Sequence, residues 1–295
     1  MPDTPASEIC DCHVHVVGPS EEFPQAEGRA YTAGPATVER LRAAANPLGV
    51  GRFVLVQPSF YGSDNSYLLR TLDTLKGRGR GVAVFDPGAS GADSLRQYAQ
   101  RGVCGVRINL YSKLRMAAPV ALKDILARCT AQLPDAGWHL EIIAPLPVLA
   151  SAAPAIAGSA LPIVIDHYGL PGDAEPESAL GRCLLDLLTL SHVWIKLSAP
   201  YRVVADPLAT APPAAWLPAL LRAAPGRCVW GSDWPYAPRR QDQTDTKETV
   251  PYRPLDYRSV LEHFVAALPS ASVADQILRA NPERLYGFDA PGNER

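Results

Sequence analysis

The sequence predicts an α/β protein of the (β/α)8 barrel class, folded as a single domain over residues 1–295. Eight short apolar runs alternate with segments that are apolar at helical spacing. Continuously apolar runs are typical of parallel strands that are covered on both faces. Eight such units fit a barrel of this length. A doubly wound open sheet is the alternative, but no Gly-X-Gly-X-X-Gly signature of a dinucleotide site follows the first run.

The predicted elements follow one another from end to end. Strands are expected at residues 8–13, 52–57, 81–85, 103–109, 138–143, 162–167, 193–198 and 228–233. Amphipathic helices are expected within ATVERLRAAANPLG, NSYLLRTLDTL, VALKDILARCTAQL, SALGRCLLDLLTL and AAWLPALLRAA, and the chain ends in helix. Thr37 is expected to cap the first helix. The longest irregular segment, residues 235–258, is expected to lie as a loop over the barrel mouth.

Bulk properties exclude several classes of partner. The formal net charge of −2 gives no electrostatic reason to expect nucleic acid or an anionic membrane. No apolar run reaches the roughly 18 residues of a membrane helix, and no secretory signal is visible. The six cysteines are dispersed and form no Cys-X-X-Cys pair, so a reduced cytoplasm is the expected location. Nothing in the pattern indicates an oligomeric state.

The stretch ICDCHVHVVG near the start of the chain carries a His-X-His pair, His13 and His15. Side chains alternate along a strand, so both imidazoles are expected on one face. Converging imidazoles suit a metal ion, a polarised carbonyl or a proton relay. By the same alternation, Cys10 and Cys12 are expected to face away from the histidines as small buried hydrophobic residues.

Ionisable residues gather at the carboxyl ends of the predicted strands, the edge at which barrels of this class carry their active sites. They are His13, His15, Arg107, Lys113, Glu141, Asp166, His167, Lys196, Arg202 and Asp233. Three histidines and one aspartate from different strands predict a shared site.

Six motifs, in order along the chain, together resemble a known family: DCHVHVVGP, FVLVQPSFYGSDN, GVRINL, IDHYG, WGSDWPY and NPERLYGF. They resemble the amidohydrolase superfamily and, more narrowly, its branch of 2-pyrone-4,6-dicarboxylate lactonases. The resemblance covers nearly the whole chain. It implies a hydrolase that opens a small, anionic, carboxylated lactone in the degradation of aromatic compounds.

Lactone hydrolysis needs a base for water, donors for the oxyanion and a proton for the leaving oxygen. One carboxylate can serve the first and third steps, and the resemblance places the catalytic aspartate at Asp233. His13, His15 and His167 are expected to donate hydrogen bonds to the developing oxyanion.

Substrate carboxylates call for forked cationic donors, which Arg107 and Arg202 supply at strand ends. The resemblance adds Lys113, Tyr31 and Ser59 to the substrate-binding residues. In the lactonase pattern an arginine stands at Lys113, and lysine keeps the charge but loses the fork.

Glu141, which is also among the predicted substrate-binding residues, departs from the pattern as well, because the lactonase pattern has a tyrosine at this position. A carboxylate there would repel an anionic substrate unless it is protonated, paired with Lys196 or Arg107, or bound to a metal.

Three alternatives remain open at this stage. We expect no obligatory metal, but His13, His15, His167 and Asp233, with Glu141 as a further ligand, have the composition of a zinc site. That alternative covers a zinc-dependent lactonase for a sulfonated muconolactone and a decarboxylase. A sugar-acid lactone isomerase or hydrolase is the second, because Glu141 could accept hydroxyl hydrogen bonds. A non-catalytic binding protein is the third, and a buried Asp233 argues against it.

Overall fold

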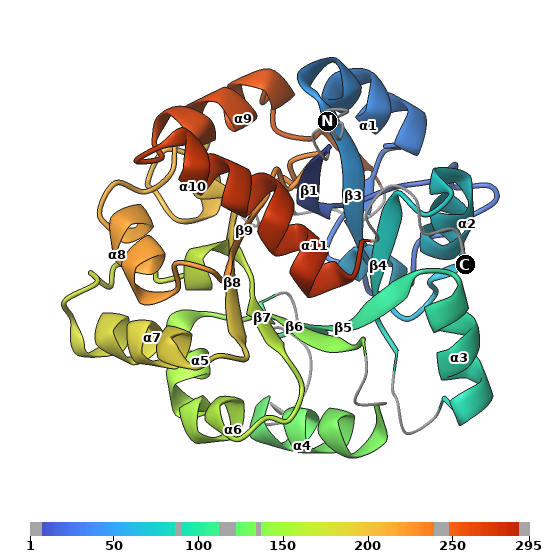
Figure 1. Ribbon diagram of the computed structural model, residues 1–295. Coiled ribbons are helices and arrows are strands. Elements are labelled where there is room, and N and C mark those ends of the chain that lie inside the picture. The colour runs from blue at the N-terminus through green and yellow to red at the C-terminus, as the bar shows by residue number, and fades with distance from the viewer. Residues whose placement is uncertain (1–7, 86–89, 112–121, 134–136, 239–247, 289–295) are drawn as a thin grey trace, which may run out of the picture.

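A computed structural model describes residues 8–85, 90–111, 122–133, 137–238 and 248–288 of the chain. Its eight parallel strands pair in the order β1-β3-β4-β5-β6-β7-β8-β9, which confirms the predicted barrel (Figure 1). The strands are β1 Ile9–Val14, β3 Val50–Val56, β4 Gly79–Ala83, β5 Val103–Asn109, β6 His139–Ile143, β7 Ile163–Ile165, β8 Val193–Ser198 and β9 Cys228–Gly231. Each lies within a few residues of its predicted range, because continuous apolar runs mark strands that are buried on both faces.

The barrel closes where the end of β9 meets β1. The backbone N–H of Asp233 donates to the carbonyl of His13 at 2.9 Å, and the N–H of His15 donates to the carbonyl of Trp234 at 2.8 Å. A Cβ atom at Gly231 would lie 2.5 Å from the Cβ of His13, so this approach requires glycine. Closure therefore brings the His-X-His pair and Asp233 to one edge.

Helices surround the barrel (Figure 1). They are α1 Val38–Ala45, α2 Ser66–Leu75, α3 Ala92–Gln100, α4 Leu122–Gln132, α5 Leu146–Ser151, α6 Ala153–Ala157, α7 Ala179–Thr189, α8 Trp216–Ala223, α9 Tyr257–Ala266, α10 Ala271–Asp275 and α11 Asn281–Tyr286. All five amphipathic segments of the sequence contain one of them. Thr37 is the N-cap residue of α1, although its side chain accepts no capping hydrogen bond.

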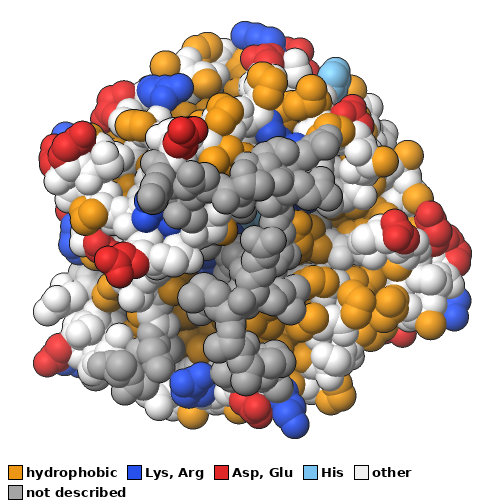
Figure 2. All heavy atoms as spheres, turned by 180° about the vertical axis from the view of Figure 1, so that it is seen from behind, with side chains coloured by type: hydrophobic (Ala, Val, Ile, Leu, Met, Phe, Trp, Pro, Cys, Tyr) orange, Lys and Arg blue, Asp and Glu red, His pale blue; other side chains and the backbone are white. Residues whose placement is uncertain are grey.

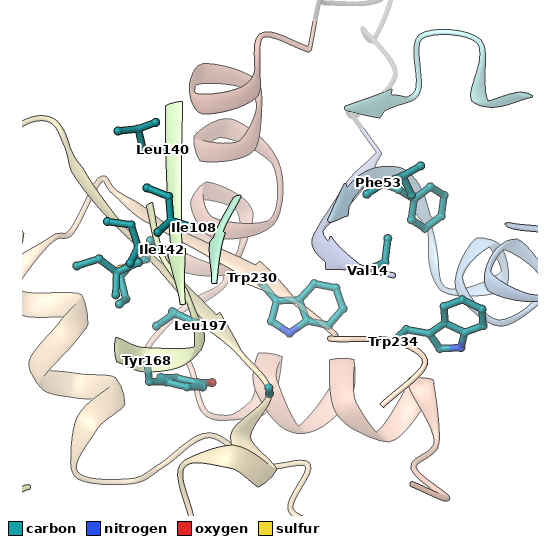
Figure 3. Close-up of a cluster of buried hydrophobic side chains, with 14 of the residues drawn as sticks. Val14, Phe53, Ile108, Leu140, Ile142, Tyr168, Leu197, Trp230 and Trp234 are labelled. Atoms are coloured by element: carbon teal, nitrogen blue, oxygen red, sulfur yellow. The ribbon is translucent and has the colours of Figure 1, made fainter. Parts of the chain in front are cut away.

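The main hydrophobic core lies between the strands and the helices. Figure 3 shows part of it, with Ile142, Leu197 and Tyr168 on the left of the view, Trp230 in the middle and Trp234 on the right. Ile142 and Leu197 alternate along β6 and β8 with Glu141 and Lys196, whose side chains lie in the barrel interior. No helix in the described part of the chain combines the length and apolarity needed to cross a bilayer.

A second hydrophobic cluster fills the amino-terminal end of the barrel interior. It joins Cys12, Val54 and Trp194 to Tyr286, the last residue of α11, and to Phe288, which comes after this helix. Figure 1 shows α11 crossing in front of the strands at this end, and Figure 2 shows the molecule from the opposite side. The carboxyl end of the barrel is therefore the end that remains for a functional site.

The expected orientation of Cys10 and Cys12 is wrong. Both pack in the interior cluster, while the side chain of Asp11 points outward and accepts from the Tyr257 hydroxyl of α9 at 2.8 Å. A register shift between Asp11 and Val14 in the β1–β3 pairing interrupts the alternation. Such a bulge lets the cysteines and then His13 face the same interior.

The predicted mouth loop, residues 235–258, is only partly described, because residues 239–247 lie outside the described chain. Its second half forms β10 Thr249–Val250, which pairs with β2 Thr32–Ala33. Arg253 lies over the ring of Tyr201, 4.6 Å from its centroid. For residues 239–247, the expected position over the barrel mouth stays a prediction.

Candidate active site

The candidate site is built on residues that directly follow the barrel strands. His13 lies near the end of β1 and His15 directly follows this strand. His167 begins the 3-10 turn η4 (His167–Gly169) after β7, and Asp233 follows β9. His167 and Asp233 both have positive φ angles, 52° and 62°. Non-glycine residues in this left-handed region are strained, and such residues cluster at functional sites.

The two histidines of β1 converge on one oxygen of Asp233. Oδ1 lies 3.5 Å from Nε2 of His13 and 3.3 Å from Nε2 of His15. The ring of His167 packs against that of His13, with 4.7 Å between centroids. The structure thus brings together the three histidines and the aspartate that the sequence singled out.

The other oxygen of Asp233 is held in place by the 3-10 turn η5 (Pro200–Arg202). Nε of Arg202 donates to Oδ2 at 3.1 Å, and the hydroxyl of Tyr201 donates to the same atom. Burial favours the protonated acid, but Arg202, His167 and His15 outweigh it and hold the pKa of Asp233 well below 3.8. Asp233 is therefore a fixed carboxylate whose Oδ1 has no hydrogen-bond partner among the described residues.

The remaining histidine nitrogens are oriented by neighbouring strands. Nδ1 of His15 lies 2.7 Å from the carbonyl of Val56, so it donates its proton there. Nδ1 of His167 lies 2.8 Å from the hydroxyl of Ser198 on β8. Burial lowers the pKa of His167 to about 4, so its imidazole is neutral at physiological pH.

A second layer of charged side chains lies directly beneath His13. The ammonium of Lys196 donates to Glu141 and lies 3.6 Å from Asp166 Oδ1. It also lies 3.3 Å from Nδ1 of His13. Lys196 and Glu141 are fully buried, and burial opposes both charges. Even so, each supports the charge of the other: the pKa of Lys196 is raised above 10.5 and that of Glu141 is lowered below 4.5.

Glu141 thus meets one of the three conditions under which a carboxylate can lie in this barrel, a pairing with Lys196. Its place beneath His13 separates it from the Arg202 side of the cluster, and its predicted contact with substrate stays a prediction. Glu141 favoured a sugar-acid lactone because its carboxylate could accept hydrogen bonds from substrate hydroxyls. The pairing with Lys196 gives this carboxylate a partner within the protein and removes that argument.

Three of the predicted substrate-binding residues, Arg107, Tyr31 and Ser59, differ in where the structure places them. Arg107 is buried, and its Nη1 donates to the carbonyl of Gln57 at 2.5 Å, while Nε has no partner among the described residues. Tyr31 is buried, and Arg202 and Asp233 are among the charges that act on its hydroxyl, which places it beside the cluster. Ser59 is exposed in the turn after β3.

Lys113 lies outside the described residues. Its predicted role in binding substrate is untested and stays a prediction.

Within the described part of the chain, two groups of side chains could hold a metal ion: His13 with His15 and Asp233, and His13 with Asp166 and His167. A tetrahedral zinc ion with ligands at about 2.0–2.1 Å sets its ligand atoms about 3.3 Å apart. The distances of 3.5 and 3.3 Å to Asp233 Oδ1 match this spacing. The first group therefore fits a single zinc ion in position. Lys196 lies against the second group, where its ammonium would oppose a cation.

This architecture defines a barrel enzyme with a histidine–aspartate centre at the carboxyl ends of its strands. The chain belongs to the amidohydrolase family, whose model matches residues 10–288.

Among its relatives are two lactone hydrolases. The 4-sulfomuconolactone hydrolase of Rhizobium radiobacter is 31% identical over 278 residues, which cover 94% of this chain and 89% of the relative. The 2-pyrone-4,6-dicarboxylate hydrolase of Comamonas testosteroni is 31% identical over 297 residues, 96% of this chain and 90% of the relative. A solved structure of a putative 2-pyrone-4,6-dicarboxylic acid hydrolase from Pseudomonas putida has a TM-score of 0.73 at 30% identity, over 96% of this chain and 98% of that one.

Proposed function

We propose that this protein is a hydrolase that opens a small carboxylated lactone, of the 2-pyrone-4,6-dicarboxylate kind, in the degradation of aromatic compounds. The names and the similarity of the relatives support the reaction class. The observation that carries the proposal is Asp233: a buried carboxylate with one oxygen anchored and the other free, facing two imidazoles.

Asp233 serves as the general base and then as the acid. Arg202 and Tyr201 hold Oδ2, so Oδ1 is the atom that accepts a proton from the attacking water. The water oxygen adds to the lactone carbonyl, and the tetrahedral intermediate then collapses with cleavage of the bond to the ring oxygen. Asp233 returns its proton to that oxygen, which restores the carboxylate.

The imidazoles of His13 and His167 stabilise the negative charge that develops on the carbonyl oxygen. His15 was also expected to do so, but its Nδ1–H already donates to the Val56 carbonyl, so a neutral His15 has no proton on Nε2 to donate. His13 and His167 lie in ring contact within a fully buried part of the site. Donors fixed in a water-poor environment stabilise an oxyanion more strongly than they would in bulk water. Because burial keeps the pKa of His167 near 4, it acts as a neutral donor and not as a permanent cation.

The substrate carboxylates pair with arginine. Arg107 carries a guanidinium Nε that no described group satisfies, and a buried charge without a partner is costly. A substrate carboxylate would satisfy it. Nε of Arg202 donates to Asp233, and its terminal nitrogens, which form no hydrogen bond with the described residues, could reach a second anionic group.

If zinc binds, His13, His15 and Asp233 would hold it, and it would polarise the lactone carbonyl or acidify a bound water. The lone pair of His15 Nε2 supports this possibility, because it faces Asp233 Oδ1 at 3.3 Å with Nδ1 already donating elsewhere. A proton or a cation between those two atoms would relieve the repulsion. The fit to zinc keeps a sulfonated muconolactone, the substrate in the name of another relative, as the second candidate.

Ring opening of a lactone panel would test the proposal. Purified protein is assayed with 2-pyrone-4,6-dicarboxylate, 4-sulfomuconolactone and an uncarboxylated lactone of the same ring size, with the metal content of the same sample measured. We expect a carboxylated or sulfonated lactone to be hydrolysed at least about 30-fold faster than the neutral one, because a lost buried charge pair costs about 2–5 kcal/mol. Equal rates on all three would contradict it.

A further inference from the structure

The charged layer beneath His13 has a feature that the proposed reaction does not use. Lys196 rises from the middle of β8 and is fully buried between Glu141 of β6 and Asp166 after β7. Its ammonium contacts both carboxylates and also Nδ1 of His13, at 3.3 Å. Two acidic partners hold the charge of Lys196 in place within the barrel.

The contact with Lys196 decides which nitrogen of His13 carries the proton. An ammonium can only donate a hydrogen bond, so Nδ1 of His13 must accept one. The neutral imidazole then has its proton on Nε2. Asp166 Oδ1 lies 3.4 Å from the same Nδ1, but neither of its oxygens forms a hydrogen bond with the described residues. The geometry favours Lys196 over Asp166 as the partner of Nδ1.

We propose that Lys196 is a positioning residue, which holds His13 in the Nε2–H form and so makes it a hydrogen-bond donor to the lactone oxygen. The Nε2–H form of His13 is inferred from the contact with Lys196, whereas donation to the lactone oxygen rests on the proposed function. Nε2 of His13 faces Asp233 Oδ1 and the space beside it, where the lactone carbonyl is polarised. Glu141 and Asp166 act one step further back, because they fix the ammonium.

The same contact has a consequence for metal binding. A histidine that ligates a metal through Nε2 usually donates its Nδ1–H to a carboxylate or carbonyl. His15 has this arrangement through Val56, but His13 has an ammonium at the equivalent place. Lys196 thus weakens the zinc site at the ligand that both candidate metal groups share.

Tautomer assignment by NMR tests the proposal on the full chain. Protein labelled with 15N-histidine is studied by long-range 1H–15N correlation at pH 7.5, and His13 is assigned with His13→Gln. We expect wild-type His13 to carry its proton on Nε2. In Lys196→Met the proton should move to Nδ1, with Asp166 as the new acceptor. Arg52→Met, which removes a buried cation paired with Glu283 at the other end of the barrel, should leave the pattern unchanged.

Two further measurements sharpen the test. In Lys196→Met, kcat should fall while KM changes little, since a positioning residue acts on the transition state. Zinc affinity, measured by competition with a chromophoric chelator, should rise at least about tenfold, because a positive charge is removed near the ligand. Unchanged zinc affinity, or equal changes in Arg52→Met, would overturn the assignment.

A wild-type spectrum with the His13 proton on Nδ1 would overturn the proposal outright, whether or not any variant folds. If Lys196→Met does not fold, the double variant Lys196→Met/Glu141→Gln, which removes both charges of the pair, is used in place of the single variant. The spectrum does not depend on turnover. A protein that opens no lactone but shows the Nε2–H form would refute the proposed function and leave the assignment intact.

Discussion

The two ends of the barrel interior differ in kind, although the same strands build both. At the amino-terminal end, cysteines and valines pack against Tyr286 and Phe288. At the carboxyl end, histidines, carboxylates and arginines crowd around Asp233. Along β8 the change takes four residues: Trp194 lies in the apolar cluster, Lys196 in the buried charged layer, and Ser198 bonds His167.

The difference shows how a barrel can carry so many buried charges. Most charges of the carboxyl end have a partner of opposite sign within the interior, as Lys196 has Glu141 and Arg202 has Asp233. Arg107 is the exception, because it forms no ion pair with the described residues. The apolar end supplies burial and stability, so that the polar end can be arranged for chemistry. Removing a group should thus affect activity at one end and only stability at the other.

The largest effect is expected at Asp233. Asp233→Asn should fold and lower kcat by roughly 10²–10⁴-fold, because the amide cannot accept the proton of the attacking water. Tyr286→Phe is the matched change at the apolar end. It removes a hydroxyl that has no hydrogen-bond partner among the described residues, and kcat should not change. Near-normal turnover by folded Asp233→Asn would remove this residue from the mechanism.

The next effect is expected at Arg107. Arg107→Met should lower kcat/KM for a carboxylated lactone by the equivalent of about 2–5 kcal/mol, mainly through KM, because the buried substrate carboxylate loses its partner. Steady-state kinetics with carboxylated and neutral lactones would measure it. An unchanged kcat/KM would assign Arg107 to its contact with the Gln57 carbonyl.

A smaller effect is expected from Tyr201. Tyr201→Phe keeps the ring under Arg253 but removes the hydroxyl that donates to Asp233 Oδ2. Hydrogen bonds to charged groups contribute about 1.5–3 kcal/mol, so kcat should fall about 10- to 100-fold. The variant and wild type are compared at saturating substrate. No change in kcat would show that Arg202 alone fixes the carboxylate.

The smallest effect is expected from pH. The base must be deprotonated, and the pKa of Asp233 lies well below 3.8, while His167 loses its proton above about pH 4. Rate therefore should fall only as pH drops below these values. Between pH 5 and 8, kcat/KM should stay constant within about threefold. An acid limb with an apparent pKa between 5 and 7 would contradict the assignment of Asp233 as the base.

The fold was predictable because hydrophobic pattern and topology agree. Apolar runs gave the strands, and parallel strands bring their carboxyl ends to one edge, which assembled His167 and Asp233 without further information. The bulge after Asp11 was not predictable, because it changes the side-chain alternation without a glycine or proline to mark it. The two-residue strands β2 and β10 were also missed, since so short a pairing has no periodicity.

The site was predicted less completely than the fold. The hydroxyl of Tyr201 donates to Asp233, but a tyrosine beside Arg202 in KLSAPYR gives no sequence signal of this contact. The sequence places Lys196 among the ionisable residues at the strand ends and offers it as a partner for Glu141, but it does not indicate the contact with His13. Its depth in the barrel depends on strand tilt and register, which place it beneath His13 and which no sequence pattern records.

The side chains at the end of α11 and just after it close the amino-terminal end of the barrel interior. Tyr286 and Phe288 are buried there, and the backbone carbonyl of Tyr286 accepts from Arg80 at 3.0 Å. Substrate, water and the ring-opened acid must then all enter and leave through the carboxyl end of the barrel. In the proposed reaction, the product carries one carboxylate more than the lactone. It would leave past Arg107 and Arg202 and compete with the next substrate molecule for them.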